Sequence, residues 1–310
     1  MTSLEAVSTY LAPEKVSIAE ILQSLGMSES QTKLYHRFYG YSHIRTAPGA
    51  SITSLMLCAA AGLDALPGRE NQVHYVIAAR TIQMAAPYPD NPLQDVRRKL
   101  GLDHAIAFAV SQHGCASGLL AIHLADRLLA AEGDPSKMAL VFTGEKALRK
   151  STQVIRDSAV MGESSAAFLV RCGGEKDKLL AYATRAMGQF CGTPFLTKDM
   201  ETAFKLTYPD ALAEVLLAAV ALAGAELSEI ALVLPHNVNQ LSWIRLCVQI
   251  GLPSERVFLD NLPRIGHCFC ADNFINYQTA CEQGRLHAGD KYAMVSVGLG
   301  ATFSAMIFRH

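Results

Sequence analysis

Apolar residues along this chain fall into two kinds of pattern. Short runs rich in Val, Ile, Leu and Ala alternate with longer segments whose apolar positions recur every three to four residues. The short runs are typical of buried strands, and the longer segments of helices packed against a sheet. We predict strands over 5–11, 74–80, 105–111, 138–144, 165–171, 179–185, 230–235, 256–260, 292–297 and 302–309. We predict helices over 16–25, 29–38, 51–65, 91–100, 207–224, 239–250 and 271–284, and a further helix directly after Cys115.

A similar order of strands and helices occurs in the two halves of the chain. Each half offers about five strands with helices between them, and the polar stretch Gly173–Lys178 lies between the halves. Short apolar strands flanked by helices indicate sheets that are covered on both faces. We therefore predict an α/β protein built from two similar halves, residues 1–175 and 176–310.

One thiol stands at a position where helix geometry favours its anion. The strand over 105–111 ends at Ser111, a tight turn follows at Gly114-Cys115, and an apolar helix begins there. Cysteine reacts as the thiolate, and the dipole and free N–H groups of a helix N-terminus stabilise an anion. Cys115 is therefore a candidate nucleophile, with a buried structural cysteine as the alternative reading.

The second half adds three turn segments next to strands. His236 follows a strand, His267 follows a glycine turn, and Gly298-Leu299-Gly300 connects two strands. A thiol can take an acyl group, a histidine can move a proton, and backbone N–H groups of Cys115 and the glycine turn can stabilise an oxyanion. Each feature alone also fits a structural histidine or an ordinary turn. Together they indicate acyl transfer.

Composition narrows the classes of function. The chain has 310 residues, of which 50% are hydrophobic and 18% charged, and its net charge is −1. These values suit a compact enzyme and give no reason to expect nucleic acid or a membrane as partner. The N-terminus lacks the pattern of a signal peptide, and the apolar run over 215–225 is too short to span a bilayer. We expect a cytoplasmic protein whose eight cysteines are reduced.

A compact group of metal-type ligands, His267-Cys268-x-Cys270, occurs once in the chain. A structural zinc site needs a second ligand pair at a recognisable spacing, and the sequence has none. We therefore expect no metal, and we interpret Cys268 and Cys270 as packing residues. For Asp272 we favour capping of the helix that follows over orientation of His267.

The motifs and their order resemble the β-ketoacyl-acyl-carrier-protein synthase III family of the thiolase superfamily. The residues that carry the resemblance are Cys115-Ala-Ser-Gly118, Val233-Leu-Pro-His-Asn-Val-Asn239 and the strand from Asp290 to Val297 that leads into Gly298-Leu-Gly300. The resemblance implies a five-layered α-β-α-β-α fold and a homodimer. It implies Cys115 as the acylated nucleophile, His236 as a catalytic histidine, and the 298–300 turn as part of the oxyanion hole. It also places Tyr88, Asn239 and Phe269 in the substrate pocket, with Tyr88 reaching across the dimer.

Two departures from the family pattern bear on the reaction. Synthase III enzymes usually have Gly-Asn where this chain has Gly266-His267, so the resemblance implies a Cys-His-His site. The segment Arg37-Phe-Tyr-Gly40 lacks the Trp and Arg-Thr-Gly pattern associated with coenzyme A, which favours a donor tethered to a carrier protein over an acyl-coenzyme A. Acyl-carrier-protein or coenzyme A thioesters are thus the expected substrates.

Three functions are consistent with these residues. In the first, Cys115 takes an acyl group from a thioester, and a malonyl-type thioester then loses carbon dioxide and attacks the acyl-enzyme, with His236 and His267 stabilising the enolate. In the second, His267 acts as a base and the acyl group passes to an alcohol or amine. In the third, the chain is a catalytically silent partner of an active relative. The first is the leading prediction, and none of the three requires a metal or redox cofactor.

Overall fold

A single nine-stranded sheet runs through the molecule in the computed structural model, which describes residues 2–83, 86, 89–149, 152–191 and 196–310. Its strand order is β11-β12-β13-β10-β1-β9-β6-β4-β5. These strands are β1 Thr2–Tyr10, β4 Val73–Ala79, β5 Ile106–Val110, β6 Met138–Thr143, β9 Ser165–Cys172, β10 Lys178–Ala186, β11 Ile230–Pro235, β12 Lys291–Gly298 and β13 Thr302–Arg309. Two small ribbons pair β2 Glu14–Ser17 with β3 His43–Thr46, and β7 Val154–Ile155 with β8 Ala159–Val160.

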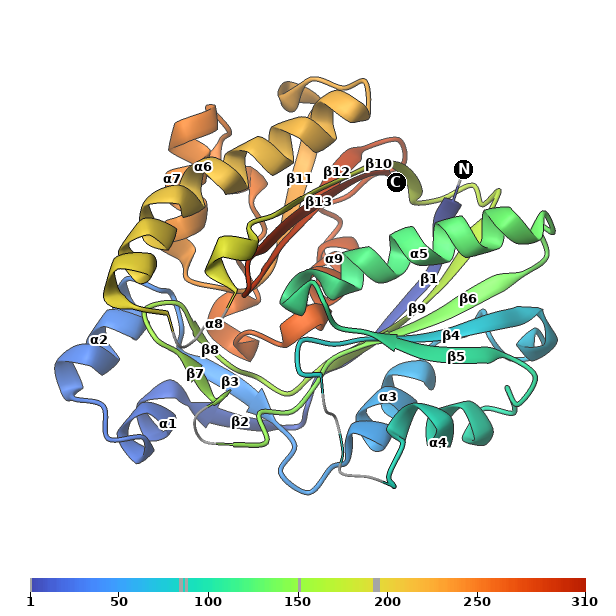
Figure 1. Ribbon diagram of the computed structural model, residues 1–310, viewed down its shortest axis with the longest axis horizontal. Coiled ribbons are helices and arrows are strands. Elements are labelled where there is room, and N and C mark those ends of the chain that lie inside the picture. Colours follow the sequence, from blue (N-terminus) through green and yellow to red (C-terminus); the bar gives the residue numbers. More distant parts are fainter. Residues whose placement is uncertain (1, 84–85, 87–88, 150–151, 192–195) are drawn as a thin grey trace.

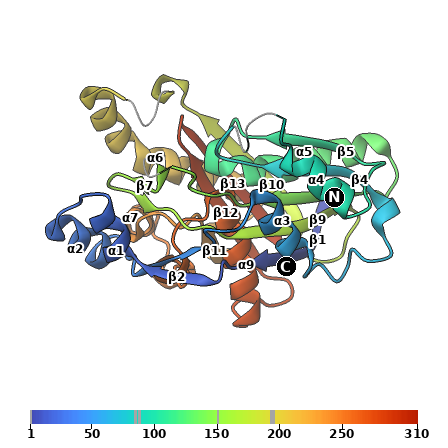
Figure 2. The ribbon, with the colours of Figure 1, turned by 90° about the horizontal axis from the view of Figure 1, so that it is seen from below.

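Helices divide the molecule into five layers (Figure 1). The helices α3 Ile52–Ala60 and α4 Pro92–Lys99 cover one outer face, over β1, β4, β5 and β9. The helices α6 Lys198–Leu222 and α7 Gln240–Ile250 lie on the opposite outer side, where α6 packs on β10, β12 and β13. Between the two parts of the sheet lie α5 Ser117–Glu132 and α9 Asp272–Glu282. The short helices α1 Ile18–Ser24 and α2 Glu29–Arg37 project at one end (Figure 2), and α8 Leu262–Ile265 precedes the loop of His267.

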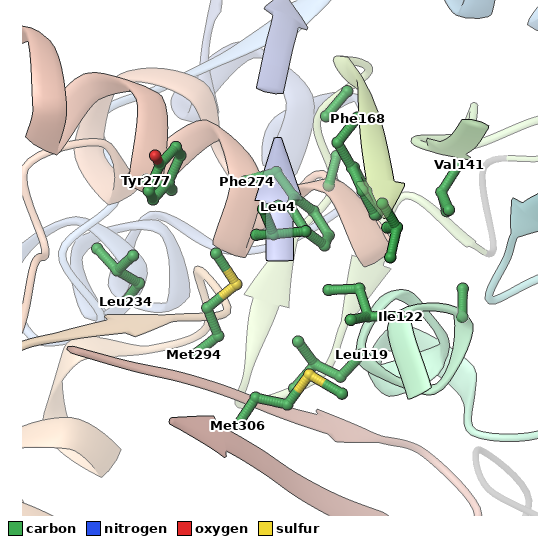
Figure 3. Packing of buried hydrophobic residues seen from close by; sticks show 14 of the residues in the cluster. Leu4, Leu119, Ile122, Val141, Phe168, Leu234, Phe274, Tyr277, Met294 and Met306 are labelled. Carbon is green, nitrogen blue, oxygen red and sulfur yellow. The ribbon is translucent and has the colours of Figure 1, made fainter. Parts of the chain in front are cut away.

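The largest hydrophobic cluster fills the central layer. It brings side chains of α5 and α9 against both parts of the sheet, and Figure 3 shows Leu119 and Ile122 of α5 close to Met306 of β13. Phe168 of β9 and Phe274 of α9 stack with ring centroids 4.0 Å apart. Because the two central helices are buried on most sides, the loops at their N-termini are held firmly in the interior.

Helix α5 and the turn before it form an apolar segment, Gly114–Glu132, which by length and composition alone is able to cross a membrane. In this segment, 56% of the most apolar 18-residue window is buried inside the protein. A core helix between two sheet layers has the same properties, and this is the position that α5 occupies (Figure 1).

Most predicted elements form within a few residues of the predicted bounds, and three differ. The helix expected over 207–224 begins at Lys198, because Thr197 caps its first turn and Pro209 is accommodated inside it. The strand expected over 256–260 is reduced to one bridge between Val233 and Val257, next to a 3₁₀ turn at Ser254–Arg256. The first part of the helix expected over 16–25 is strand β2, which pairs with β3.

Residues at the end of the link between the halves are tied into the core. Strand β1 pairs with β10 at Ser3 and Lys178, and the preceding residue, Asp177, is only 1% exposed. The Asp177 carboxylate accepts hydrogen bonds from the hydroxyls of Tyr277 (2.5 Å) and Tyr292 (2.9 Å). It also lies 2.7 Å from Nδ1 of His310. The division at residues 175 and 176 thus falls two residues before a buried polar junction.

Candidate active site

Cys115 lies in a 3₁₀ turn, Gly114–Ala116, between the end of β5 and the start of α5. The backbone enters this turn through Gly114, whose φ of +52° is readily adopted by glycine. The Cys115 side chain is buried, with only 3% of the residue exposed. The thiol therefore stands at the N-terminal end of a core helix, as the sequence predicts.

His267 lies beside this thiol. Its Nε2 lies 3.2 Å from the Sγ of Cys115. The backbone of His267 is fixed on both sides, because its N–H donates to the carbonyl of Val160 (2.9 Å) and its carbonyl accepts from Gly162 (2.8 Å). A residue from each half of the chain thus contributes to one thiol–imidazole pair, as expected for an activated nucleophile.

Asp272 orients the imidazole of His267 from the other side. Its Oδ2 lies 2.5 Å from Nδ1 of His267. The same carboxylate is fully buried and accepts backbone N–H groups of Asn237 (2.5 Å) and Cys268 (2.7 Å). The favoured prediction that Asp272 caps α9 is wrong, since no side-chain hydrogen bond caps this helix. The other reading is correct, because the loop folds the carboxylate back onto His267.

This arrangement gives His267 an unusual affinity for protons. Burial alone lowers the pKa of its imidazole, but the charges of Asp272 and Cys115, and the hydrogen bonds to both, outweigh burial and raise the pKa from 6.5 to about 10. Asp272 holds one proton on Nδ1, so Nε2 is the atom that takes the proton of the thiol, and the raised pKa keeps this imidazole protonated at physiological pH. His267 is therefore positioned to take the proton of Cys115 and to return it.

His236 lies next to this pair without being bonded to the thiol. It follows β11, and its ring centroid is 6.0 Å from that of His267 and 5.4 Å from that of Trp243. Its Nδ1 is buried and has no hydrogen-bond partner within the residues that the structure describes. Burial and the neighbouring charge of His267 lower the pKa of His236 to about 3. Its imidazole is therefore neutral at physiological pH.

The glycine turn Gly298–Gly300 packs directly against the nucleophile loop. A methyl group added at Gly298 would lie 1.8 Å from the carbonyl oxygen of His113, and one added at Gly114 would lie 3.1 Å from the Cα of Gly298. Only glycine permits this approach of two backbones. The structure thus brings the predicted backbone donors of Cys115, Leu299 and Gly300 to the same end of α5.

The remaining predicted pocket residues have mixed positions. Phe269 is buried, and its ring centroid is 6.1 Å from that of His267. Asn239 is the N-cap of α7, since its Oδ1 accepts the backbone N–H of Ser242 at 3.1 Å. Its Nδ2 also donates to the carbonyl of Asp157 at 3.4 Å, so both ends of this side chain hold structure. Tyr88 lies outside the described residues.

Sequence reasoning missed one side chain that touches the thiol. The hydroxyl of Thr81, two residues beyond the end of β4, donates to Sγ of Cys115 at 3.3 Å. A threonine just past the carboxyl end of a parallel strand is a signal that could have been followed. Within the described part of the chain, no group of three His, Cys, Asp or Glu residues is arranged to hold a metal ion.

Comparison with known proteins finds similar sequences. Residues 220–310 match the family model of the 3-oxoacyl-[acyl-carrier-protein (ACP)] synthase III C terminal. A curated relative, β-ketoacyl-[acyl-carrier-protein] synthase III of Aquifex aeolicus, is 25% identical over 224 residues, which cover 69% of this chain and 70% of that protein.

Solved structures show the same fold over nearly the whole chain. The 3-oxoacyl-[acyl-carrier-protein] synthase III of Aquifex aeolicus has a TM-score of 0.83 at 22% identity, with 100% of both chains covered. ChlB3, an acyltransferase, has a TM-score of 0.86 at 20% identity and covers 99% of this chain and 97% of its own. A variant of OleA from Xanthomonas campestris has a TM-score of 0.83 at 18% identity, covering 100% of this chain and 96% of its own.

The solved structures confirm the predicted five-layered α-β-α-β-α fold. The family model and the curated relative both make the chain similar to β-ketoacyl-acyl-carrier-protein synthase III, as the resemblance in its sequence implies.

Proposed function

We propose that the chain is an acyltransferase in which Cys115 takes an acyl group from a thioester and passes it to a hydroxyl or amine. That it belongs to an acyl-transferring class follows from its relatives, which are synthase III and acyltransferase enzymes. The choice of acceptor rests on one observation, the line of contacts from Cys115 through His267 to Asp272. This line favours the second of the three predicted functions over the leading one.

The first half-reaction uses His267 as base and then as acid. Nε2 of His267 takes the proton of Cys115, and the thiolate attacks the thioester carbonyl. The tetrahedral oxyanion is stabilised by backbone N–H groups of Cys115 and the 298–300 turn. As the intermediate collapses, the imidazolium returns the proton to the leaving thiol, and the acyl group stays on Cys115.

The second half-reaction uses the same imidazole on the acceptor. Neutral His267 removes the proton of an incoming hydroxyl or amine, whose lone pair attacks the Cys115 thioester. The thiolate leaves, and the proton on His267 restores the thiol. An asparagine at this place is able to donate a hydrogen bond but unable to accept a proton, so the histidine backed by Asp272 is the feature that supports transfer to an acceptor of this kind.

Decarboxylative condensation is the second candidate. It is favoured by His236, a neutral imidazole whose ring centroid lies 6.0 Å from that of His267. Two imidazoles near the acylated thiol are able to donate to a malonyl thioester carbonyl and to stabilise the enolate that decarboxylation leaves.

One experiment separates these candidates. The protein is loaded with a panel of acyl thioesters, on carrier protein and on coenzyme A, and Cys115 is examined by intact-protein mass spectrometry. The acyl-enzyme is then mixed with malonyl carrier protein or with alcohols and amines. We expect ester or amide without release of carbon dioxide. Carbon dioxide together with a β-keto product would overturn the acyltransferase proposal.

The variant His267→Asn makes the comparison sharper. We expect it to lower acyl transfer to an alcohol on the order of 100-fold or more, because the base is lost. Unchanged transfer in this variant would contradict the role of His267.

If no thioester acylates native Cys115 and Cys115→Ala leaves pathway output unchanged, the catalytically silent reading is correct.

We also propose that the protein assembles as a homodimer through β5. This strand is the edge of the sheet, and its residue Ile106 is 61% exposed. An unpaired apolar edge strand is a template for a second copy. We expect a dimer by light scattering, and a shift toward monomer in Ile106→Lys. A native monomer at micromolar concentration would overturn this assembly.

The cellular setting is the last part of the proposal. Eight free cysteines, two of them exposed, suit a reducing compartment, which supports the cytoplasm as the location.

We retain the division into halves 1–175 and 176–310, in which the first half carries the nucleophile and the second carries the two histidines and the glycine turn.

A further inference from the structure

We propose that Thr81 is a catalytic residue that stabilises the Cys115 thiolate through its hydroxyl, and that Glu145 is the positioning residue that fixes Thr81 in place. The proposal deepens the acyl-transfer function and rests on it, since both half-reactions pass through a thiolate at Cys115.

The hydroxyl of Thr81 has one acceptor in reach that changes charge during the reaction. Its Oγ1 lies 3.3 Å from Sγ of Cys115 and 3.6 Å from Sγ of Cys270. The thiol of Cys270 already donates to the carbonyl of Gly114 at 3.2 Å. The Glu145 carboxylate also interacts with this hydroxyl, and of the two neighbouring sulfurs Cys115 is the one open to its proton. The sulfur of Cys115 then has two polar neighbours, the Thr81 hydroxyl and Nε2 of His267.

Glu145 holds the backbone that carries this hydroxyl. It follows β6, and it is almost fully buried. One carboxylate oxygen accepts the backbone N–H of Thr81 at 2.5 Å, and the other accepts that of Ile82 at 2.9 Å. Two bonds from one side chain to consecutive N–H groups fix both the place and the direction of the Thr81 residue.

Charge on the sulfur determines when the Thr81 bond contributes most. A hydroxyl donates more strongly to a thiolate than to the sulfur of a thiol or a thioester. The thiolate forms when His267 takes the proton, and it forms again when the acyl group leaves for the acceptor. The Thr81 hydroxyl keeps its own proton throughout, so no additional reactant is needed. Both half-reactions should therefore depend on it.

The chain offers a matched control. Ser117 is a second buried hydroxyl, two residues after Cys115, and its Oγ has no hydrogen-bond partner among the described residues. The variant Ser117→Ala removes a buried hydroxyl near Cys115 that makes no hydrogen bond to the Cys115 sulfur. It therefore shows the effect of losing a buried oxygen alone.

The test measures alkylation of Cys115 by iodoacetamide as a function of pH, followed by mass spectrometry in the absence of any acyl donor. In Thr81→Val we expect the pH of half-maximal alkylation to rise by about one unit, because a hydrogen bond to a charged group is lost. Thr81→Ser should restore the native profile, and Ser117→Ala should match it. A native profile in Thr81→Val, or a failure of Thr81→Ser to restore it, would overturn the proposal.

Single-turnover rates give a second readout. We expect Thr81→Val to slow both acylation and transfer on the order of 10-fold, whereas a purely structural change would lower the melting temperature without moving the alkylation profile. For Glu145→Gln we expect the same direction of change, and little further loss when it is combined with Thr81→Val, because the two residues act as one unit. Additive losses would contradict the positioning role of Glu145.

Alkylation needs no substrate, so it decides the role of Thr81 separately from the acyl-transfer proposal. A shifted alkylation profile in a protein that transfers no acyl group would refute the proposed function alone. Normal acyl transfer with an unshifted profile would refute the role of Thr81 alone.

Discussion

Asp272 determines which nitrogen of His267 carries a proton. The carboxylate accepts from Nδ1 and is itself held by two backbone N–H groups, so its orientation is fixed before any substrate binds. This preorganisation supports the proposed role of His267 as a base toward Cys115 and toward an incoming acceptor.

We predict that Asp272→Asn slows acyl transfer on the order of 100-fold or more, because an amide is able to donate to Nδ1 and to favour the wrong tautomer. Single-turnover rates of the acyl-enzyme provide the measurement. Glu282→Gln makes the same chemical change at an exposed position of the same helix and should be without effect. Equal rates in both variants would contradict the orienting role.

The raised pKa of His267 also has a consequence for stability. Its pKa in the folded state is about 10, above the ordinary 6.5. Proton binding by His267 therefore stabilises the folded state fully below pH 6.5, and this contribution is lost as the pH rises toward 10. We predict a fall in the free energy of unfolding over this window, measured with urea, and a smaller fall in His267→Asn. Equal pH dependence in both proteins would show that the pair does not stabilise the fold.

Sequence reasoning at the scale of residues selected Cys115, His236 and His267, which the structure places close together, because helix starts and strand ends leave local signals. It missed Thr81 and Glu145, and it gave Asp272 the wrong first role. The contacts of Thr81 and Glu145 join segments that are far apart in sequence and that no periodicity relates. A carboxylate followed by a helix looks the same in sequence whether it caps that helix or turns back to a histidine.

At the scale of elements, the site depends on two loops that meet at their backbones. The turn after β12 presses Gly298 against the carbonyl of His113, immediately before the nucleophile. The bounds of β11 are the predicted ones, whereas α6 begins at Lys198, well before the predicted start at residue 207. The run over 256–260 is apolar without being a strand, since it contacts β11 through one bridge only.

We predict that Gly298→Ala lowers the rate of Cys115 acylation by about 100-fold, because the added methyl displaces the nucleophile loop. Intact-protein mass spectrometry of the acyl-enzyme measures this rate. Gly188→Ala is the matched control, since a methyl group there meets nothing within 4 Å. An unaffected Gly298→Ala would mean that the two loops do not need their close approach.

At the scale of the molecule, the buried residue Asp177 connects β1 with the C-terminal part of the chain. The Asp177 carboxylate accepts hydrogen bonds from the hydroxyls of Tyr277 and Tyr292, and the backbone N–H of Leu4 in β1 donates to the Asp177 carbonyl at 3.1 Å.

We predict that Asp177→Ala destabilises the protein by about 3 kcal/mol, because the buried tyrosine hydroxyls lose their acceptor. Urea unfolding measures the effect, with the exposed Asp199→Ala as control. A change below about 0.5 kcal/mol would contradict this role.

The thiol and its base come from opposite sides of the link at 173–178, with Cys115 before it and His267 and Asp272 after it. Neither piece of a chain cut at this link would hold a complete proton relay. Acylation of Cys115 would then report whether the two pieces have reassociated. The signal is the increase in mass of the piece that carries Cys115.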